Sequence, residues 1–485
     1  MKYLISILVC FIYISSTYSQ EYWEKNIIRE GRTTPIGDII IYNDNYYFSI
    51  IEELNNKIFE NYYSAYYKVS PNGYVEFSGF FSEDNINMIG TTQVLNNGNL
   101  LGLGQVCYSI EDENFGLYAI EFNESLDVLN SCEIELPSMK FGYIMNSIKY
   151  GNKNLIFHIC TSNPAFTGAP GDGYIAILDS ALNVVKDSLF SVFIYDIDKD
   201  LTDSTQFVIH SKGLDTSPEL GYTQVNILDD NFNLLSTPIS FSGNDMSYYF
   251  SIHTCPDTGY YFSAMCTRGS GNWTNSYAVS KANMYLEFEN YQALDTLPYW
   301  HFTTEHNGID TFNDFVYSGG NFEYHGMQNS TPNYFTLTIM DTALNRLGQV
   351  FYGGDKNYLL TTIKTTPEGD IILLGRYSEL STDKWNIFIM KVNPNGLITS
   401  SNESQTIPIK NAIVLPNPGS SYLQVHTGVY PAIFKLFSIS GQQMIEEKIN
   451  GETSHINTNY LETGTYIWQV IKDGQEVENG KWVKE

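Results

Sequence analysis

Aromatic and titratable side chains gather in the segment 291–314 of this chain. Its residues include Trp300, His301, Glu305, His306 and Asp310. The segment is also the longest interval between two of the sequence repeats described below, and loops that carry such groups on a rigid scaffold commonly bind ligands. Zinc catalysis is not expected, because His301-x-x-x-Glu305-His306 has neither spacing used by helical zinc peptidases.

Trp273 is a further candidate contact. It lies in a Gly-Asn-Trp-Thr stretch, and with Trp300 it would provide flat aromatic surfaces on which sugars or peptides pack. The alternative is that both tryptophans are ordinary side chains of exposed loops. The predicted binding residues are therefore Trp273, Trp300, His301 and His306. No residue is predicted to be catalytic, because no Gly-x-Ser-x-Gly, paired Cys-x-x-Cys, phosphate-binding loop or dinucleotide fingerprint is present.

Three carboxylates alternate along the chain at Asp196, Asp198 and Asp200, as calcium ligands often do. An EF-hand loop would require glycine and glutamate where this chain has Leu201 and Phe207, so that motif is excluded. A calcium site and a solvated loop between repeats remain the two interpretations. No other cofactor is predicted.

The acidic composition excludes one class of partner. The 485-residue chain has a formal net charge of −28, whereas nucleic-acid binding needs clustered lysine and arginine to neutralise phosphates. Tyrosine, phenylalanine and β-branched residues are abundant, which favours strands over helices. All cysteines except Cys10 are scattered over a large body, so we expect mostly buried thiols rather than a disulfide framework.

Residues 1–19 have the features of a secretory signal peptide. Lys2 precedes an apolar run from Tyr3 to Ile14, and small residues lead to Ser19, after which we expect cleavage. No later stretch approaches the roughly 18 apolar residues that a membrane-spanning helix needs. We therefore expect a soluble mature protein with no transmembrane span.

The body of the chain repeats two short patterns, and the copies of each lie roughly 50 to 60 residues apart. The first pattern is a turn followed by an apolar run, and its seven copies begin at Asn45, Asn99, Asn154, Gln206, Gly259, Asn321 and Asp370. The second is a strand that enters and leaves a polar turn, and its seven copies begin at Lys68, Ile120, Ile177, Ile227, Val279, Ile339 and Lys391. Because the two series alternate, each unit should contain two hairpins and hence four strands.

Seven four-stranded units predict a closed ring. A β-helix would have a shorter repeat, and a sandwich would not keep two patterns in phase over seven copies, so the expected fold is all-β with a seven-bladed β-propeller over residues 20–404. The unit resembles bacterial propeller repeats that join two blades through an aromatic-Gly-Gly step, here Tyr352-Gly353-Gly354. We expect the segment Tyr22–Ile28 to pair with the last blade and close the ring.

A second domain follows a polar linker at residues 405–410. Residues 411–485 contain a Pro-Asn-Pro turn and short alternating stretches, which predict a small β-sandwich. The expected strands are 412–415, 422–425, 432–439, 444–449, 466–472 and 480–484.

Residues 411–485 contain several further short motifs. They are the Pro-Asn-Pro turn, a glycine after the middle strand, a Leu-x-x-Gly-x-Tyr pattern and a basic end, at Pro416, Asn417, Pro418, Gly441, Leu461, Gly464, Tyr466, Lys481 and Lys484. With these features the segment resembles the C-terminal sorting domain of the type IX secretion system of Bacteroidetes, except that Gln442 replaces a commonly found lysine. The resemblance implies contact with the type IX secretion machinery, passage through the periplasm, and release or attachment at the outer-membrane surface.

Three functions agree with this organisation. The one we favour is a secreted or surface-displayed propeller that binds a protein or glycan through loops on one face, since propellers carry unrelated functions in their loops. The second is a secreted hydrolase or lyase that degrades polysaccharide or peptide. It would require carboxylates and histidines to converge at one end of the channel, with raised carboxylate pKa values. The third is a structural envelope protein, which would bind no ligand.

Overall fold

The computed structural model contains strands and no helix in the part of the chain that it describes, so the all-β prediction is confirmed. The described residues are 22–28, 32–53, 62–80, 86–109, 114–134, 143–150, 154–160, 173–179, 181–190, 194–212, 223–235, 239–240, 246–268, 274–294, 301–304, 306–322, 332–380, 382, 384–397, 412–415, 419–427, 430–451, 453–472, 474–484. The predicted signal peptide lies outside these residues.

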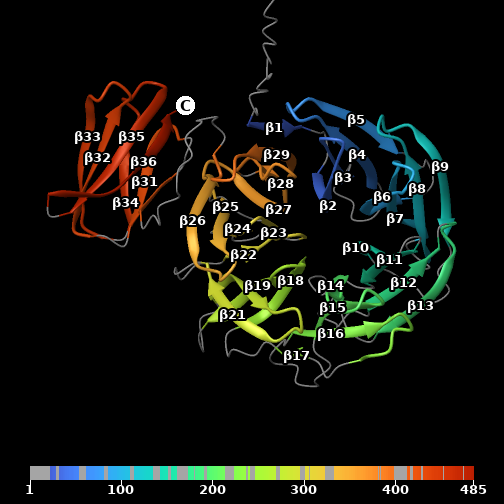
Figure 1. Cartoon of the computed structure of the whole chain (residues 1–485). Helices are drawn as coiled ribbons and strands as arrows, with labels where there is room; N and C mark the ends of the chain where they lie inside the picture. The colour runs from blue at the N-terminus through green and yellow to red at the C-terminus, as the bar shows by residue number, and fades with distance from the viewer. Residues whose placement is uncertain are drawn as a thin grey trace, which may run out of the picture.

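Seven small antiparallel sheets, which we call blades 1 to 7, follow one another around a ring (Figure 1). Blade 1 comprises β2 (Arg32–Tyr42), β3 (Asn45–Glu53), β4 (Tyr62–Val69) and β5 (Val75–Phe80). Blade 2 comprises β6 (Ile86–Val94), β7 (Leu100–Ser109), β8 (Asn114–Phe122) and β9 (Val128–Ile134). Blade 3 comprises β10 (Tyr143–Tyr150), β11 (Asn154–Cys160), β12 (Gly173–Leu178) and β13 (Val184–Phe190).

The second half of the ring repeats this order. Blade 4 comprises β14 (Ile194–Lys199), β15 (Gln206–Lys212), β16 (Thr223–Asp229) and β17 (Ile239–Ser240). Blade 5 comprises β18 (Met246–Cys255), β19 (Gly259–Arg268), β20 (Thr274–Ala282) and β21 (Phe288–Ala293). Blade 6 comprises β22 (Phe302–Thr303), β23 (Ile309–Phe312), β24 (Phe315–Phe322), β25 (Tyr334–Asp341) and β26 (Arg346–Gly353). Blade 7 comprises β27 (Asn357–Thr365), β28 (Ile371–Ser378), β29 (Asn386–Val392) and β1 (Trp23–Ile27).

The N-terminal strand closes the ring, as expected from the sequence. β1 pairs antiparallel with β29, from Trp23 opposite Lys391 to Ile27 opposite Ile387, and so supplies the outer strand of blade 7. The Trp23 side chain is buried, and its Nε1 donates a hydrogen bond of 2.8 Å to the carbonyl oxygen of Pro71 in blade 1. Trp23 therefore belongs to blade 7 and is hydrogen-bonded to blade 1.

The second repeat pattern is a turn in which one polar side chain satisfies several backbone groups. In the turn after β25, the Oδ1 atom of Asp341 accepts the N–H groups of Ala343 and Asn345, while the Asp341 carbonyl accepts that of Leu344. Leu344 has a positive φ of 66°, which is unfavourable for a leucine, but its side chain is buried in the core. Leu126, Leu182, Phe232 and Leu286 occupy the same position with φ between 59° and 65°, and Gly73 and Gly396 do so in the first and last copies.

The apolar core of the ring lies between blades rather than within one. One cluster joins Leu103 of blade 2 to Tyr174 of blade 3, and another joins Phe48 of blade 1 to Ile389 of blade 7. Burial of these faces stabilises the packing of neighbouring blades.

Residues after the ring form two further sheets around one apolar core. The first contains β30 (Ala412–Leu415), β31 (Tyr422–Thr427) and β34 (Thr453–Asn457), and the second contains β33 (Gln443–Ile449), β32 (Ala432–Ser438), β35 (Gly464–Lys472) and β36 (Gln475–Lys484). β34 was not expected from the sequence, and β36 begins earlier than expected. The predicted domain boundaries near residues 404 and 411 lie outside the described residues and stay predictions.

Ring closure through β1 makes a test of stability possible. Trp23→Ala should lower the free energy of unfolding by about 3–5 kcal/mol, because it removes a buried aromatic side chain and leaves the Pro71 carbonyl without its donor. Urea unfolding measures the loss. Ile28→Ala, at a neighbouring exposed side chain, is the control and should change stability by less than about 0.5 kcal/mol. Equal effects of the two substitutions would contradict this account of closure.

Candidate functional site

The innermost strand of each blade is interrupted at a corresponding position. In blades 2, 3, 4, 5 and 7 one extra residue bulges from it, with register shifts at Ile89/Thr91, Ile144/Asn146, Ile194/Asp196, Tyr249/Ser251 and Leu360/Thr362. Bulges redirect side chains and often border functional sites. The interruptions in blades 1 and 6 are longer, and we call these two segments the blade 1 and blade 6 excursions.

The blade 1 excursion comprises residues 37–39, where the register of β2 moves from Ile36 to Ile40. Gly37 adopts a positive φ of 72°, and a Cβ atom there would overlap the carbonyl oxygen of Gly90 in blade 2, so only glycine fits. Asp38 follows at once, and its Oδ1 accepts the N–H of Ile39 over 2.8 Å. The glycine turn thus fixes the carboxylate of Asp38.

The blade 6 excursion lies between β22 and β23, and its described residues are 304 and 306–308. It is held against the innermost strand of blade 7, because the N–H of His306 donates to the Thr361 carbonyl and the N–H of Ile363 donates to the Asn307 carbonyl, both over 2.9 Å. On its other side, the N–H of Gly308 donates to Ser251 Oγ of blade 5 over 3.1 Å. The backbone of the excursion is therefore fixed by both neighbouring blades.

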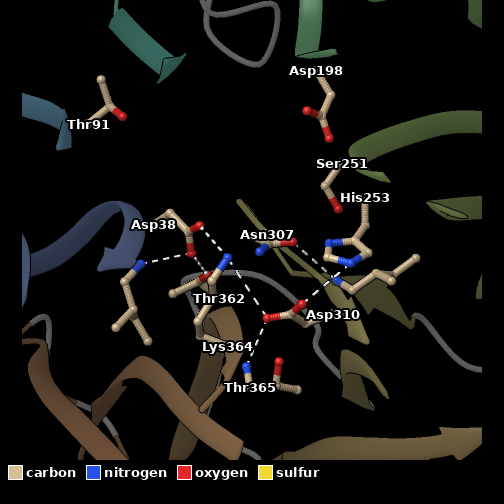
Figure 2. A network of polar contacts seen from close by, with 12 residues as sticks. Asp38, Thr91, Asp198, Ser251, His253, Asn307, Asp310, Thr362, Lys364 and Thr365 are labelled. Carbon is tan, nitrogen blue, oxygen red and sulfur yellow. Dashed lines mark hydrogen bonds and ion pairs between the residues drawn. The ribbon is translucent and has the colours of Figure 1, made fainter. Parts of the chain in front are cut away.

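A cavity of about 200 Å³ lies beside these two excursions, and we call it the channel cavity. Its lining comes from the innermost strands of six blades: Gly37, Asp38, Ser147, Ile148, Tyr195, Asp196, Ile197, Asp198, Ile252, His253, His306, Asn307 and Lys364. Figure 2 shows carboxylate, hydroxyl, imidazole and amide groups gathered in this region. The surroundings can offer hydrogen bonds and charge to a polar ligand.

Lys364 of β27 stands between two carboxylates (Figure 2). Its Nζ lies 3.3 Å from Asp38 Oδ2 and 3.8 Å from Asp310 Oδ2. The charge of Asp38 is the main cause that raises the pKa of Lys364 above its ordinary value. Burial alone would raise the pKa of Asp310, but the charges of Lys364 and His253 and two backbone N–H groups outweigh burial and lower it. Both partners therefore remain charged at neutral pH.

His253 of β18 completes this network. Its Nε2 lies 3.5 Å from Asp310 Oδ1 and 3.0 Å from Thr311 Oγ1. The imidazole is thus oriented by a carboxylate at the wall of the channel cavity, an arrangement that suits hydrogen bonding to a ligand and that also occurs beside general bases.

Three aspartates connect successive blades through the same pair of contacts. In Asp196, Asp198 and Asp310, Oδ1 accepts the N–H of the following residue. Their Oδ2 atoms accept N–H groups from the innermost strand of the next blade, at Ile252 over 2.7 Å, Thr254 over 3.2 Å and Thr365 over 2.8 Å. These carboxylates therefore connect neighbouring blades through hydrogen bonds near the ring axis.

The carboxylate oxygens of the predicted calcium ligands accept hydrogen bonds from backbone N–H groups of the protein. Asp196 and Asp198 connect blades as described, and Asp200 Oδ1 accepts the N–H groups of Thr202 and Asp203 in the turn after β14. Within the described residues no three His, Cys, Asp or Glu side chains are grouped as metal ligands. The calcium site stays a prediction.

The predicted binding residues have different positions. His306 lines the channel cavity, whereas His301 is fully buried and stacks on Phe322 with ring centroids 4.1 Å apart. Trp273 and Trp300 lie outside the described residues. Sequence reasoning missed Asp38, His253 and Lys364, although an aspartate recurs in the apolar innermost strands of blades 1, 4 and 6.

The predicted sorting motif is described only in part. Pro416, Asn417 and Pro418 are outside the described residues. Gly441 has a positive φ of 83°, and Leu461 is buried in the core of this domain. The hydroxyl of Tyr466 donates to the Glu462 carbonyl over 2.7 Å, and Lys484 Nζ donates to the carbonyl of Ser420. Gly464 and Lys481 lie on β35 and β36, so these residues help to build the domain.

One family comparison is decisive for the C-terminal part. Residues 413–485 match the family described as the secretion system C-terminal sorting domain. They are a type IX secretion sorting domain. The sorting domain places the protein outside the cell, either secreted or at the cell surface, and implies interaction with the type IX secretion machinery. In the described part of the chain, no helix has the length and apolarity needed to cross a membrane.

No curated protein is detectably similar in sequence to this chain. Among solved structures, the β-propeller domain of the trilobed protease from Pyrococcus furiosus is 10% identical, with a TM-score of 0.42, and the match covers 77% of this chain and 97% of that one. The polysaccharide lyase Uly1 is 8% identical with a TM-score of 0.49, over 77% and 100%. PorZ, a surface component of the type IX system of Porphyromonas gingivalis, is 7% identical with a TM-score of 0.30, over 95% and 100%. Strand pairing alone defines the seven blades.

The lowered pKa of Asp310 predicts how stability depends on pH. Its ionic contacts stabilise the fold fully above the pKa of an unfolded aspartate, near 4, and are lost as pH falls through the lower pKa of the folded state. Asp310→Asn should therefore lower the free energy of unfolding by about 2–4 kcal/mol at pH 7 and by less at pH 3.

Urea unfolding of both proteins over this pH range measures the difference. Asp230→Asn is the control, because Asp230 forms an exposed ion pair with Lys186 and should contribute less than about 0.5 kcal/mol. A penalty for Asp310→Asn that does not change with pH would show that its charge has no part in stability.

Proposed function

We propose that this protein is an exported, non-catalytic binding module whose ligand occupies the channel cavity. The sorting domain accounts for export, and the ring provides a rigid wall on which side chains from six blades converge. Contacts from both neighbouring blades hold the backbone of the blade 6 excursion in place. A ligand that contacts His306 and Asn307 therefore does not have to order this backbone when it binds.

The state of the carboxylates is the observation that carries this proposal. A hydrolase or lyase of the kind considered above needs a carboxyl group with a raised pKa to donate a proton. Beside the channel cavity, Asp310 is instead held ionised by Lys364 and backbone N–H groups, and the lining residues Asp196 and Asp198 accept N–H groups that connect two blades. Burial does raise the pKa of Asp370, but this residue contacts Tyr22 and Lys391 at ring closure.

One observation favours the enzymatic alternative. His253 is oriented by Asp310 at the cavity wall, which is how a carboxylate orients the imidazole of a general base. A base of this kind would turn over an ester, peptide or glycoside placed in the cavity. Release of product from such substrates by the purified mature protein, and its loss in His253→Ala, would support catalysis over binding.

Ligand-dependent stability tests the binding function directly. Polysaccharides, peptides and small amines should be screened by thermal unfolding of the mature protein, because a ligand at 100 times its Kd stabilises the native state by about 2.7 kcal/mol. We expect the midpoint to rise by several degrees with at least one ligand class, and His306→Ala to weaken that ligand's binding about tenfold. His455→Ala, at an exposed histidine of the sorting domain, should leave binding unchanged.

Two outcomes would contradict the binding function. One is turnover of the stabilising compound. The other is a shift in the unfolding midpoint that persists in His306→Ala but disappears with His455→Ala, which would locate the ligand on the sorting domain.

A further inference from the structure

We propose that the channel cavity binds an organic cation, namely the ammonium or guanidinium group of a basic peptide side chain or of a polyamine. This inference rests on the binding function proposed above and names the chemical class of its ligand. It is carried by the charge of the cavity wall, by the hydrogen-bonding capacity left on that wall, and by the fixed position of its carboxylates.

The cavity wall carries more negative than positive charge when its histidines are neutral. Asp38, Asp196 and Asp198 line it, and Asp310 lies directly behind Lys364. Lys364 is the lining residue with a permanent positive charge. With neutral histidines, three lining carboxylates face the single lysine of the lining, and Asp310 adds a fourth carboxylate 3.8 Å from Lys364 Nζ. Because a cavity with walls of low dielectric constant concentrates such a field, an excess of negative charge attracts a cation.

The wall retains hydrogen-bond acceptors that a cation can use. Each carboxylate oxygen can accept two hydrogen bonds. Asp198 Oδ1 accepts the N–H of Lys199 over 2.7 Å, and Asp38 Oδ2 accepts Lys364 Nζ over 3.3 Å. Each of these oxygens can therefore accept a second donor from the cavity side. Ammonium and guanidinium groups carry several N–H donors and no acceptor, so they complement such a wall.

A metal ion fits this wall less well than an organic cation. Calcium takes six to eight oxygen ligands at about 2.3–2.6 Å, which requires carboxylates that can approach one another. Asp196 and Asp198 already use Oδ2 to accept N–H groups of Ile252 and Thr254, and the described residues contain no group of three metal-ligating side chains. An organic cation needs only hydrogen-bond acceptors, which this wall provides.

The size and access of the cavity suit the end of a long side chain. Its volume is about 200 Å³, and a cavity of about 150 Å³ holds a benzene ring. Solvent reaches it, since the side chains of Asp38, Lys364 and His253 are 29%, 30% and 19% exposed. The two excursions form part of its wall, so they shape the entrance that such a side chain would take.

Isothermal titration of the mature protein distinguishes the sources of the cation. The probes are a blocked Gly-Gly-Lys-Gly-Gly peptide, its Gln counterpart, spermidine, calcium chloride and a neutral oligosaccharide. We expect the Lys peptide, spermidine or both to bind, the Gln peptide not to bind, and affinity to fall as salt rises. Binding of spermidine without the peptide would indicate a polyamine, and the reverse a basic protein partner.

Two substitutions should change the affinity for the cationic probe in opposite directions. Asp198→Asn should weaken binding of the cationic probe at least about tenfold, whereas Asp230→Asn, which makes the same charge change on an outer turn of blade 4, should not. Lys364→Met removes the cation that already neutralises Asp38 and Asp310, so the probe should bind more tightly. If Asp198→Asn fails to fold, the Lys364→Met result decides alone.

Several results would overturn the inference. Weaker binding of the cationic probe in Lys364→Met would show that Lys364 itself contacts the ligand. Calcium binding that depends on Asp198 would replace the organic cation by a metal. If only the oligosaccharide binds, and does so through His306, the ligand class is wrong while the binding function stands. If no probe binds and a substrate is turned over, both are wrong.

Discussion

The ring is held around its axis by carboxylates that accept N–H groups from two blades at once. The innermost strand of a blade has no strand beside it on the channel side, so its buried N–H groups need other acceptors. Asp196, Asp198 and Asp310 supply them across the gaps from blade 4 to blade 5 and from blade 6 to blade 7. Between blades 7 and 1, Asp38 instead accepts the side chains of Thr362 and Lys364.

These directional contacts complement the apolar clusters between blades. Burial of residues such as Leu103 and Tyr174 favours packing but tolerates small sliding movements, since the hydrophobic effect has no direction. A carboxylate that must reach a particular N–H group, such as Asp196 to Ile252, tolerates no such slip. The clusters therefore contribute most of the stability, and the carboxylates fix the register in which neighbouring innermost strands meet.

The parts of the fold that depend on local chemistry could be predicted from the sequence. The turn around Asp341 satisfies its own backbone within five residues, so each copy leaves a pattern of polar and apolar residues that the sequence displays. The closing strand was predictable because the segment Tyr22–Ile28 precedes the first inner hairpin, at the place where an outer strand for the last blade would lie. The candidate site was not predictable in this way. Asp310 accepts the N–H of Thr365, and these two residues lie 55 positions apart in different copies of the repeat. The sequence also could not show that two nearby histidines have different environments. His301 stacks on Phe322 in the interior, whereas His306 lines the cavity.

The double use of the carboxylates explains where this ring can acquire a specific function. Asp196, Asp198 and Asp310 cannot be replaced freely, because each satisfies N–H groups of two blades, and the negative potential at the axis follows from that structural role. An innermost strand can accommodate additional residues where it already departs from regular pairing. The two long excursions, at residues 37–39 and at residues 304 and 306–308, occur at that position and flank the same blade 7 strand that carries Lys364. A longer bulge adds side chains to the cavity wall, as Asp38, His306 and Asn307 do here, while Asp196, Asp198 and Asp310 keep their contacts between blades and contribute negative charge near the axis.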